Sequence, residues 1–198
     1  CPSSGLGTDN PRFANTNYIF STGSVWTHFS GANVGSANGV FYYVSSTRIQ
    51  DIVDGTSHTA AFSEHALAKS RTVQDRSTDQ FSMPWEASTQ QELANWCLGT
   101  PTNPSAWVSI PWANAVEYNH ILTPNRHSCE SYGQHIVNGV YWGSYPRYVR
   151  PPTSRHPGGV NLLLCDGSVR FIKDTIHLPV WQALGTRAGQ EQISNTDF

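Results

Sequence analysis

The sequence is poor in charge and has no long apolar run. Asp, Glu, Lys and Arg make up only 13% of the 198 residues, and the formal net charge is −2. A chain with this balance has no basic face to follow nucleic-acid phosphates or anionic lipid headgroups. No stretch approaches the roughly 20 apolar residues that a membrane-spanning helix needs. We therefore expect neither nucleic-acid binding nor a membrane span in this chain.

Recognised catalytic and nucleotide-binding motifs are also missing. The sequence contains no G-x-S-x-G elbow, no cysteine-nucleophile motif, no P-loop and no G-x-G-x-x-G. Its 14 acidic residues are spread along the chain without the clustered pair that glycoside hydrolysis uses. Glu64 and Glu117 are better explained as hydrogen-bonded structural carboxylates. We therefore predict that the protein is not an enzyme.

Eight histidines raise the question of a metal site, but their spacing matches no common zinc pattern. His58 and His65 lie on either side of Glu64. Three more histidines fall in one loop-rich region: His120, His127 and His135. Calcium prefers oxygen ligands from flexible loops, which this chain has in abundance. Calcium is therefore the metal that the composition leaves open, without a ligand set, and no cofactor is certain.

The residues that are abundant point to a loop-rich, exported protein. Aromatic residues make up 12% of the chain, and it has 16 glycines and 12 prolines. This composition suits a loop-rich β or α+β protein, and we predict an α+β fold rich in antiparallel sheet, with short helices. Four cysteines beside a single methionine favour an oxidising, extracellular location. The length predicts one globular domain over residues 1–198.

Residues 70–153 show no clear period and are crowded with Trp, Pro and Asn. We predict an irregular region whose short strands are held by tryptophan packing and a disulfide. Cys97 and Cys129 are the favoured pair, which leaves Cys1 with Cys165, although four cysteines allow three pairings. Five tryptophans lie in this region: Trp85, Trp96, Trp107, Trp112 and Trp142. Burial in a core is the favoured interpretation, and an exposed row that binds glycans or solutes is the alternative.

Elsewhere, turn residues divide the chain into short elements. The stretch NGVFYYV, residues 38–44, predicts a strand that leaves an Asn-Gly turn. Asp54 and Gly55 close the next segment, and residues 56–67 suit either a strand or a helix. The stretch 174–189 predicts a short helix, because Pro179 suits its first position and Gly185 can end it. Trp181 and Leu184 would share its buried face.

The clearest element is a hairpin in RHPGGVNLLLCDGSVRFI, residues 155–172. Asp166 and Gly167 between two apolar runs predict a two-residue type I′ turn. This register pairs Cys165 with Ser168, Leu164 with Val169, Leu163 with Arg170 and Leu162 with Phe171. One face is then apolar: Val160, Leu162, Leu164, Val169 and Phe171.

His156 lies at the other end of this hairpin. An extended chain places it about 30 Å from the turn, so His156 and Asp166 are not expected to share a metal. Its position before Pro157 predicts a histidine that holds the start of the strand by a hydrogen bond.

The carboxy-terminal stretch also resembles a family signature of His, nine residues and Asp-Gly, here His156, Asp166 and Gly167. The signature is typical of planctomycete-type, prepilin-like exported proteins of unknown function, sometimes given a solute-binding label. Three other stretches agree: CPSS at Cys1, DIVDGTSHTAAFSEHA at 51–66, which contains Asp54 and Gly55, and YNHILTPNRHSC at 118–129.

The resemblance implies a type IV pilin-like helix followed by a β-rich globular head. This chain lacks such a helix and resembles the later part of a longer protein, so lipid attachment at Cys1 is not expected. The resemblance also implies a non-catalytic structural protein of the cell surface or of a secretion-related pseudopilus. It would form or decorate a filament or homo-oligomer. Heads of related pseudopilins hold calcium in a loop.

Overall fold

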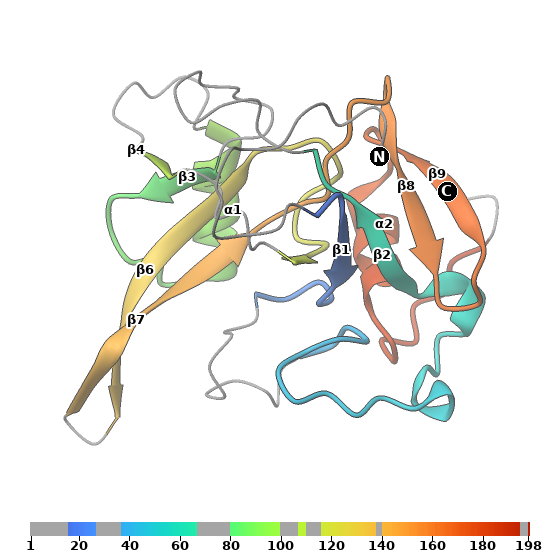
Figure 1. Cartoon of the computed structure of the whole chain (residues 1–198), viewed down its shortest axis with the longest axis horizontal. Coiled ribbons are helices and arrows are strands. Elements are labelled where there is room, and N and C mark those ends of the chain that lie inside the picture. Colours follow the sequence, from blue (N-terminus) through green and yellow to red (C-terminus); the bar gives the residue numbers. More distant parts are fainter. Residues whose placement is uncertain are drawn as a thin grey trace.

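The structure is a computed structural model. It describes residues 16–26, 37–66, 80–99, 107–109, 116–137, 140–194 and 198, and the side chains at 80, 107–109, 132–137 and 140–146 are not described. Within these ranges the chain forms two β-sheets and two short α-helices joined by long loops (Figure 1). The predicted α+β class is therefore confirmed. No helix in these ranges is long and apolar enough to cross a membrane.

The first sheet has five strands in the order β5-β1-β2-β8-β9. Their bounds are Glu117–Tyr118 (β5), Tyr18–Ser21 (β1), Ala60–Glu64 (β2), Gly159–Leu164 (β8) and Val169–Lys173 (β9). All neighbours are antiparallel except β1 and β5. Helix α2, Leu178–Gly185, lies behind β1 and β2 in Figure 1. Its Trp181 and Leu184 are fully buried against this sheet, as predicted, and Pro179 lies in its first turn.

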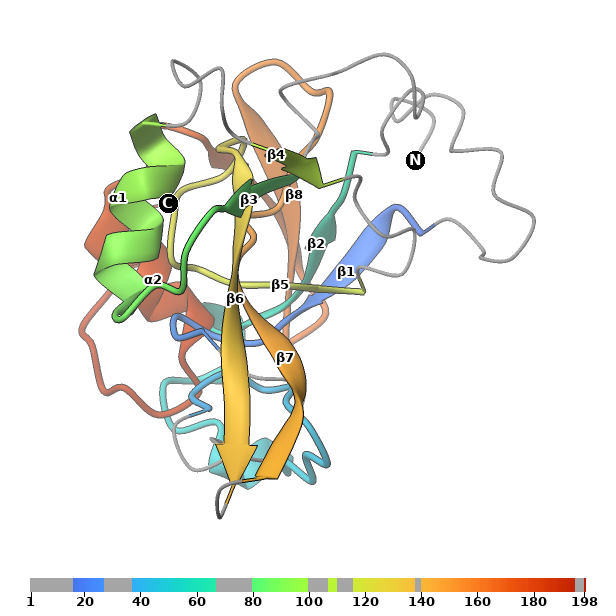
Figure 2. The same cartoon turned by 90° about the vertical axis from the view of Figure 1, so that its left-hand side faces the viewer.

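The second sheet has four strands in the order β4-β3-β6-β7. Their bounds are Trp107–Ser109 (β4), Gln80–Met83 (β3), Ser128–Val137 (β6) and Val140–Val149 (β7). Helix α1, Gln90–Gly99, packs alongside this sheet (Figure 2) and contributes Leu93, Ala94 and Cys97 to its core. The disulfide between Cys97 and Cys129 joins α1 to β6, which confirms the favoured pair.

Residues 70–153 were predicted to be irregular with short strands, and the described parts of this region are more regular than that. The region contains a ten-residue helix and two ten-residue strands. Only three residues of α1 are buried, so its apolar period is weak. Between β6 and β7 lie two residues, Asn138 and Gly139, which is the short hairpin signal that the surrounding Trp, Tyr and Pro residues obscured.

Two earlier segments also differ from expectation. Residues 38–44 form no strand, because Phe41 instead packs between Phe20 and Phe62, with ring centroids 5.5 and 5.4 Å away. For residues 56–67 the sequence left a strand or a helix open, and the structure has the strand. A 3-10 turn, Thr56–His58, leads into β2. The turn follows Gly55, whose φ of 94° is a conformation that favours glycine.

The hairpin of β8 and β9 exists, but its predicted register is wrong by one residue. Leu163 pairs with Val169, because the loop has three residues instead of two. Gly167 N–H donates to Leu164 O, and Leu164 N–H donates to Ser168 O. Gly167 alone in this turn has a positive φ, 87°, as expected for a type I turn followed by a glycine bulge.

The shifted register moves two apolar side chains out of the core. Val160, Leu162 and Leu164 are buried as predicted, but Ile172 joins them from β9. Val169 and Phe171 lie on the opposite face and are 63% and 47% exposed. A shift of one residue exchanges the two faces of a strand, so the edge strand β9 presents apolar side chains to solvent.

Candidate functional site

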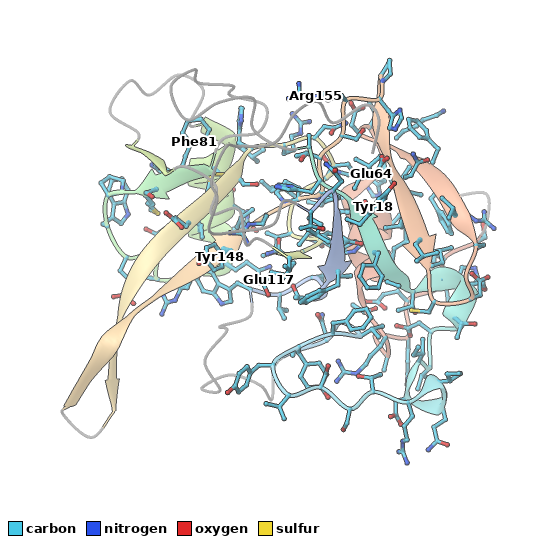
Figure 3. All side chains as sticks on the ribbon, viewed as in Figure 1. Tyr18, Glu64, Phe81, Glu117, Tyr148 and Arg155 are labelled. Atoms are coloured by element: carbon cyan, nitrogen blue, oxygen red, sulfur yellow. A yellow bond between two sulfur atoms is a disulfide. The ribbon has the colours of Figure 1, made fainter. Side chains whose placement is uncertain are left out.

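Several ionisable and hydrogen-bonding side chains gather where the end of β7 meets β5 and β2. We call this group the polar junction. It consists of Glu64, His65, Glu117, Asn119, Tyr148, Arg150, Thr153 and His156. Figure 3 shows Glu64, Glu117 and Tyr148 among the side chains of this region. The junction contains residues from all three of the longer family-like stretches, which are far apart in the sequence.

Asn119 connects the two sheets. Its main-chain N–H donates to Arg150 O (2.8 Å), and its side-chain Nδ2 donates to Tyr148 O (2.9 Å). Its Oδ1 accepts from Arg150 N–H (3.2 Å). Because Asn119 is buried, these bonds are shielded from competing water. Nothing in the local sequence marked this asparagine, since its partners lie about 30 residues away.

Arg150 places a buried positive charge in the junction. Its guanidinium lies over the Tyr148 ring, with 4.3 Å from Cζ to the centroid. Burial raises the pKa of the Glu117 carboxyl, and the charge of Arg150 partly opposes that shift. Burial likewise raises the pKa of Tyr148. The group therefore combines charge with aromatic packing, a structural use of arginine.

Glu64 holds the start of β8. Its carboxylate is almost fully buried; Oε1 lies 3.2 Å from His156 Nε2, and Oε2 accepts from Asn161 N–H (2.9 Å). The Glu64 carbonyl also accepts from Thr153 N–H (3.2 Å). The hydrogen bond predicted for His156 is therefore present, and its partner is a glutamate 92 residues earlier. Asp166 lies beyond the other end of β8, so the two ends of the signature do not meet.

Replacing His156 should weaken the contact between Glu64 and the start of β8. We expect His156→Ala to lower the free energy of unfolding by about 1–2 kcal/mol, because a buried carboxylate loses a hydrogen-bond donor. His156→Gln places an amide donor near the same position and should recover most of the loss. Urea unfolding of the three proteins measures this difference. Equal stability of all three would show that His156 does not hold the strand.

Two histidines of the family-like stretches have strongly lowered pKa values and are held in neutral form. Burial and the charge of Arg150 lower the pKa of His65 to about 4. His120 is fully buried, and burial lowers its pKa to about 3. Its Nδ1 donates to Trp181 O (2.7 Å), and its ring stacks on the Trp181 indole at 3.9 Å between centroids. His120 is therefore a packing residue of the interior, whereas His65 is half-buried.

The two Asp-Gly pairs stabilise turns. Asp54 accepts from Thr186 Oγ1 (2.9 Å), Gly189 N–H (2.8 Å) and Gln190 N–H (2.7 Å), and so fixes the loop after α2. Asp166 accepts from the N–H (2.8 Å) and the hydroxyl (2.7 Å) of Ser168. These bonds lower the pKa of Asp166 and keep its carboxylate charged. Among the described residues, no group of three or more His, Cys, Asp or Glu is placed to hold a metal ion.

The predicted tryptophan core is only partly present. Trp96 packs half-buried against the α1 core, but Trp85 is 53% exposed, so its predicted burial is wrong. Trp85 sits in a surface turn, where its Nε1 donates to Glu92 (3.2 Å). The side chains of Trp107 and Trp142 are not described, and Trp112 lies outside the described residues.

The second predicted disulfide would join Cys165 to Cys1. Cys165 is a free, half-buried thiol, and Cys1 lies outside the described residues. Burial, and to a lesser extent Asp166, raises the pKa of Cys165 to about 11. The thiol is therefore protonated and unreactive near neutral pH. The hairpin loop holds Cys165 against the chain before β2, through its N–H bond to Thr59 O (2.9 Å).

The Cys97–Cys129 bridge should contribute strongly to stability. It closes a loop with a sequence separation of 32. Replacing both cysteines with alanine should lower the free energy of unfolding by about 3–4 kcal/mol, because the unfolded chain gains conformational entropy. Chemical denaturation with and without reductant measures the effect. Cys165→Ala is the matched control and should change stability little; equal losses in the two variants would contradict this role.

The family-like stretches thus meet in one structural junction that links both sheets. A protein-family profile described as "Protein of unknown function (DUF1559)", with the short name SBP_bac_10, matches residues 1–178. The chain belongs to the DUF1559 family. No curated protein and no solved structure matches the chain. The family description assigns no activity, so a function for this DUF1559 member rests on its own geometry.

Proposed function

We propose that this DUF1559 protein is a non-catalytic, exported structural protein of the cell surface. In this proposal it is a pilin-like or pseudopilin-like head that forms or decorates an extracellular filament or homo-oligomer. The observation that carries the proposal is the hairpin of β6 and β7. Its outer half extends away from the rest of the molecule (Figure 1).

The outer half of this hairpin lacks a third strand among the described residues. Strand β3 pairs with β6 only from Ser128 to Ser131. The pairing of β6 with β7 continues six residues further, to Val137 opposite Val140. A two-stranded ribbon alone is marginally stable in water and needs a further strand or a packing surface. A neighbouring subunit would supply that surface.

The residues of the ribbon suit such a contact. In the backbone register of the outer hairpin, Ile136 is paired with Tyr141 and Val137 with Val140, so the paired positions are occupied by apolar or aromatic residue types. By contrast, the polar residues of the junction are engaged in holding backbone segments: Glu64 and Asn119 do so directly. Asp54 does the same for the loop after α2. The use of these groups as structural partners supports a structural role over a catalytic one. The prepilin-like family signature supports it independently.

The test is the assembly state of the native protein, including whatever precedes Cys1 in its natural chain. We expect filaments or defined oligomers by electron microscopy and light scattering. Charging the paired positions with Ile136→Lys and Tyr141→Lys should abolish assembly. Leu98→Lys, at an exposed position of α1, is the matched control and should assemble normally. A strictly monomeric native protein at high concentration would overturn the proposal.

A further inference from the structure

We propose that β9 pairs antiparallel with β9 of a second copy, which joins two five-stranded sheets into one continuous sheet across a two-fold axis. This inference rests on the proposed function, because it names one interface of the assembly. It is carried by a different part of the molecule from the β6–β7 hairpin. The two edges of the five-stranded sheet provide the starting point.

One edge of the sheet is joined to β7, and the other has no further strand among the described residues. At the β5 edge, Asn119 N–H bonds to Arg150 O, which joins this edge to the end of β7. At the opposite edge lies β9, whose next neighbour in the sheet is β8 alone. Five consecutive residues, Val169–Lys173, form this edge without a proline. Open, extended edges of this kind pair readily with another strand, and proteins normally block them.

The hydrogen-bond pattern shows which backbone groups of β9 point outward. Leu164 N–H bonds to Ser168 O, and Asp174 N–H bonds to Gly158 O. In an antiparallel pair the residues that bond to the neighbour alternate along the strand, so Arg170 and Ile172 also face β8. The N–H and C=O groups of Val169 and Phe171 therefore point away from the sheet. Within the described part of the chain, no main-chain hydrogen bond from a turn or loop engages them.

The side chains at these two outward positions are apolar and exposed. Val169 is 63% exposed and Phe171 is 47% exposed. Both lie on the face of the sheet opposite Trp181, because β9 pairs Val169 with Leu163 and Phe171 with Asn161. A strand added to β9 would satisfy the outward backbone groups and would cover both side chains at once. Burial of apolar surface and pairing of backbone groups thus both favour a partner strand beside β9.

The sequence of β9 is complementary to itself in one antiparallel register. With Phe171 on the two-fold axis, Phe171 faces its own copy, Val169 faces Lys173, and Arg170 faces Ile172. No like charges are then opposed. A register centred on Arg170 would instead place the two Arg170 side chains opposite each other and would also oppose Asp166 to Asp174. A two-fold contact of this kind uses the same patch on both copies.

Cysteine crosslinking tests the interface and its register together. Phe171 opposite Phe171 is a hydrogen-bonded pair with a Cα separation of about 5.5 Å, which suits a disulfide. In the full chain with Cys1→Ser and Cys165→Ser, we expect Phe171→Cys to give a covalent dimer under mild oxidation. Val169→Cys is the matched control. Its two copies would lie about 13 Å apart, so no dimer should form.

A second variant removes the interface without removing a bond of the native sheet. Phe171→Pro deletes an outward N–H group, whereas the ladder to β8 uses Arg170 and Ile172. We expect sedimentation analysis to show loss of the dimer, with less than a twofold change in the urea concentration at half-unfolding. Phe171→Lys should have the same effect through charge repulsion.

The outcomes separate this inference from the proposed function. Assemblies that persist in Phe171→Pro, with no crosslink in the Phe171→Cys variant, overturn the β9 interface and leave the structural role standing. A crosslink that forms equally well in Val169→Cys overturns the proposed register and with it the two-fold pairing. The Phe171→Cys variant could form the crosslinked dimer while the native protein forms nothing larger than a dimer. That result supports this interface and overturns the filament.

Discussion

Acidification should destabilise this protein more than any single substitution considered above. The folded state holds His65 and His120 in neutral form, with pKa values lowered to about 4 and about 3. In the unfolded chain both return to a pKa near 6.5. Protons therefore bind the unfolded state more tightly than the folded state. Stability is at its full value above pH 6.5 and falls as the pH drops from there towards the folded values.

The expected size is large because two histidines act together. Each histidine lowers stability by at most about 1.4 kcal/mol per pH unit over this window. Between pH 7 and pH 4.5 the pair would lower the free energy of unfolding by up to about 5 kcal/mol. The raised pKa of Glu117 acts in the opposite direction, since protonation of that half-buried carboxyl becomes easier in the folded state.

Urea unfolding at a series of pH values measures this dependence. Replacing His65 with Gln should make the decline between pH 6.5 and pH 4.5 shallower, because one proton-binding group is then absent from the unfolded chain. The surface variant His177→Gln is the matched control and should leave the decline unchanged. Stability that stays constant over this range in the wild-type protein would contradict the neutral state of both histidines.

Replacing Trp181 with alanine should cost about 4–5 kcal/mol of stability. The indole is fully buried in the core of the five-stranded sheet and stacks on His120. Its Nε1 also donates to Leu122 O (2.8 Å), so truncation leaves a buried carbonyl without that partner. The loss of buried area, the cavity and the unpaired carbonyl all act in the same direction.

The control for this prediction is another tryptophan of the same chain. Trp85 is 53% exposed and lies outside both cores. Trp85→Ala should change the free energy of unfolding by less than about 1 kcal/mol, which corresponds to a surface contact with Glu92. Denaturant unfolding followed by circular dichroism compares the two variants. A similar loss for both would mean that burial does not determine the cost.

Elements with strong local chemistry were predictable from the sequence. Helix α2 has a proline in its first turn, and its two large apolar residues share one face, so neighbouring residues alone specify it. The β8–β9 hairpin was predictable as an element for the same reason. The disulfide between Cys97 and Cys129 was also predicted, since both cysteines lie in the region that most needed a covalent link.

The register of the hairpin was not predictable, because Asp166-Gly167 fits two different turns. A two-residue type I′ turn needs positive φ at both residues, whereas a three-residue loop needs it only at the glycine. In the structure Asp166 does not have a positive φ, and its side chain caps Ser168 instead. The core decides between the two, since only the observed register buries Ile172 beneath α2.

The polar junction could be predicted only in part. His156 was expected to hold the start of a strand, but its partner Glu64 is 92 residues away and no local pattern connects them. Asn119 lies in a family-like stretch and Arg150 in none, but nothing along the chain indicated the role of either, because their roles depend on two sheets meeting. Buried polar groups are selected by partners in space, and the residues next to them along the chain do not reveal such partners.

The sequence by itself determined the α+β class, the presence of the β8–β9 hairpin and helix α2, because each depends on residues within a few positions or on composition. It also indicated the Cys97–Cys129 disulfide. Only the tertiary structure decided which faces of the strands are buried, which histidines are neutral and which described strand forms the edge of the sheet. Those properties depend on contacts between segments that lie far apart along the chain. Burial changes the energy of charge, hydrogen bonds and apolar surface at each of these positions, and burial exists only once the chain has folded.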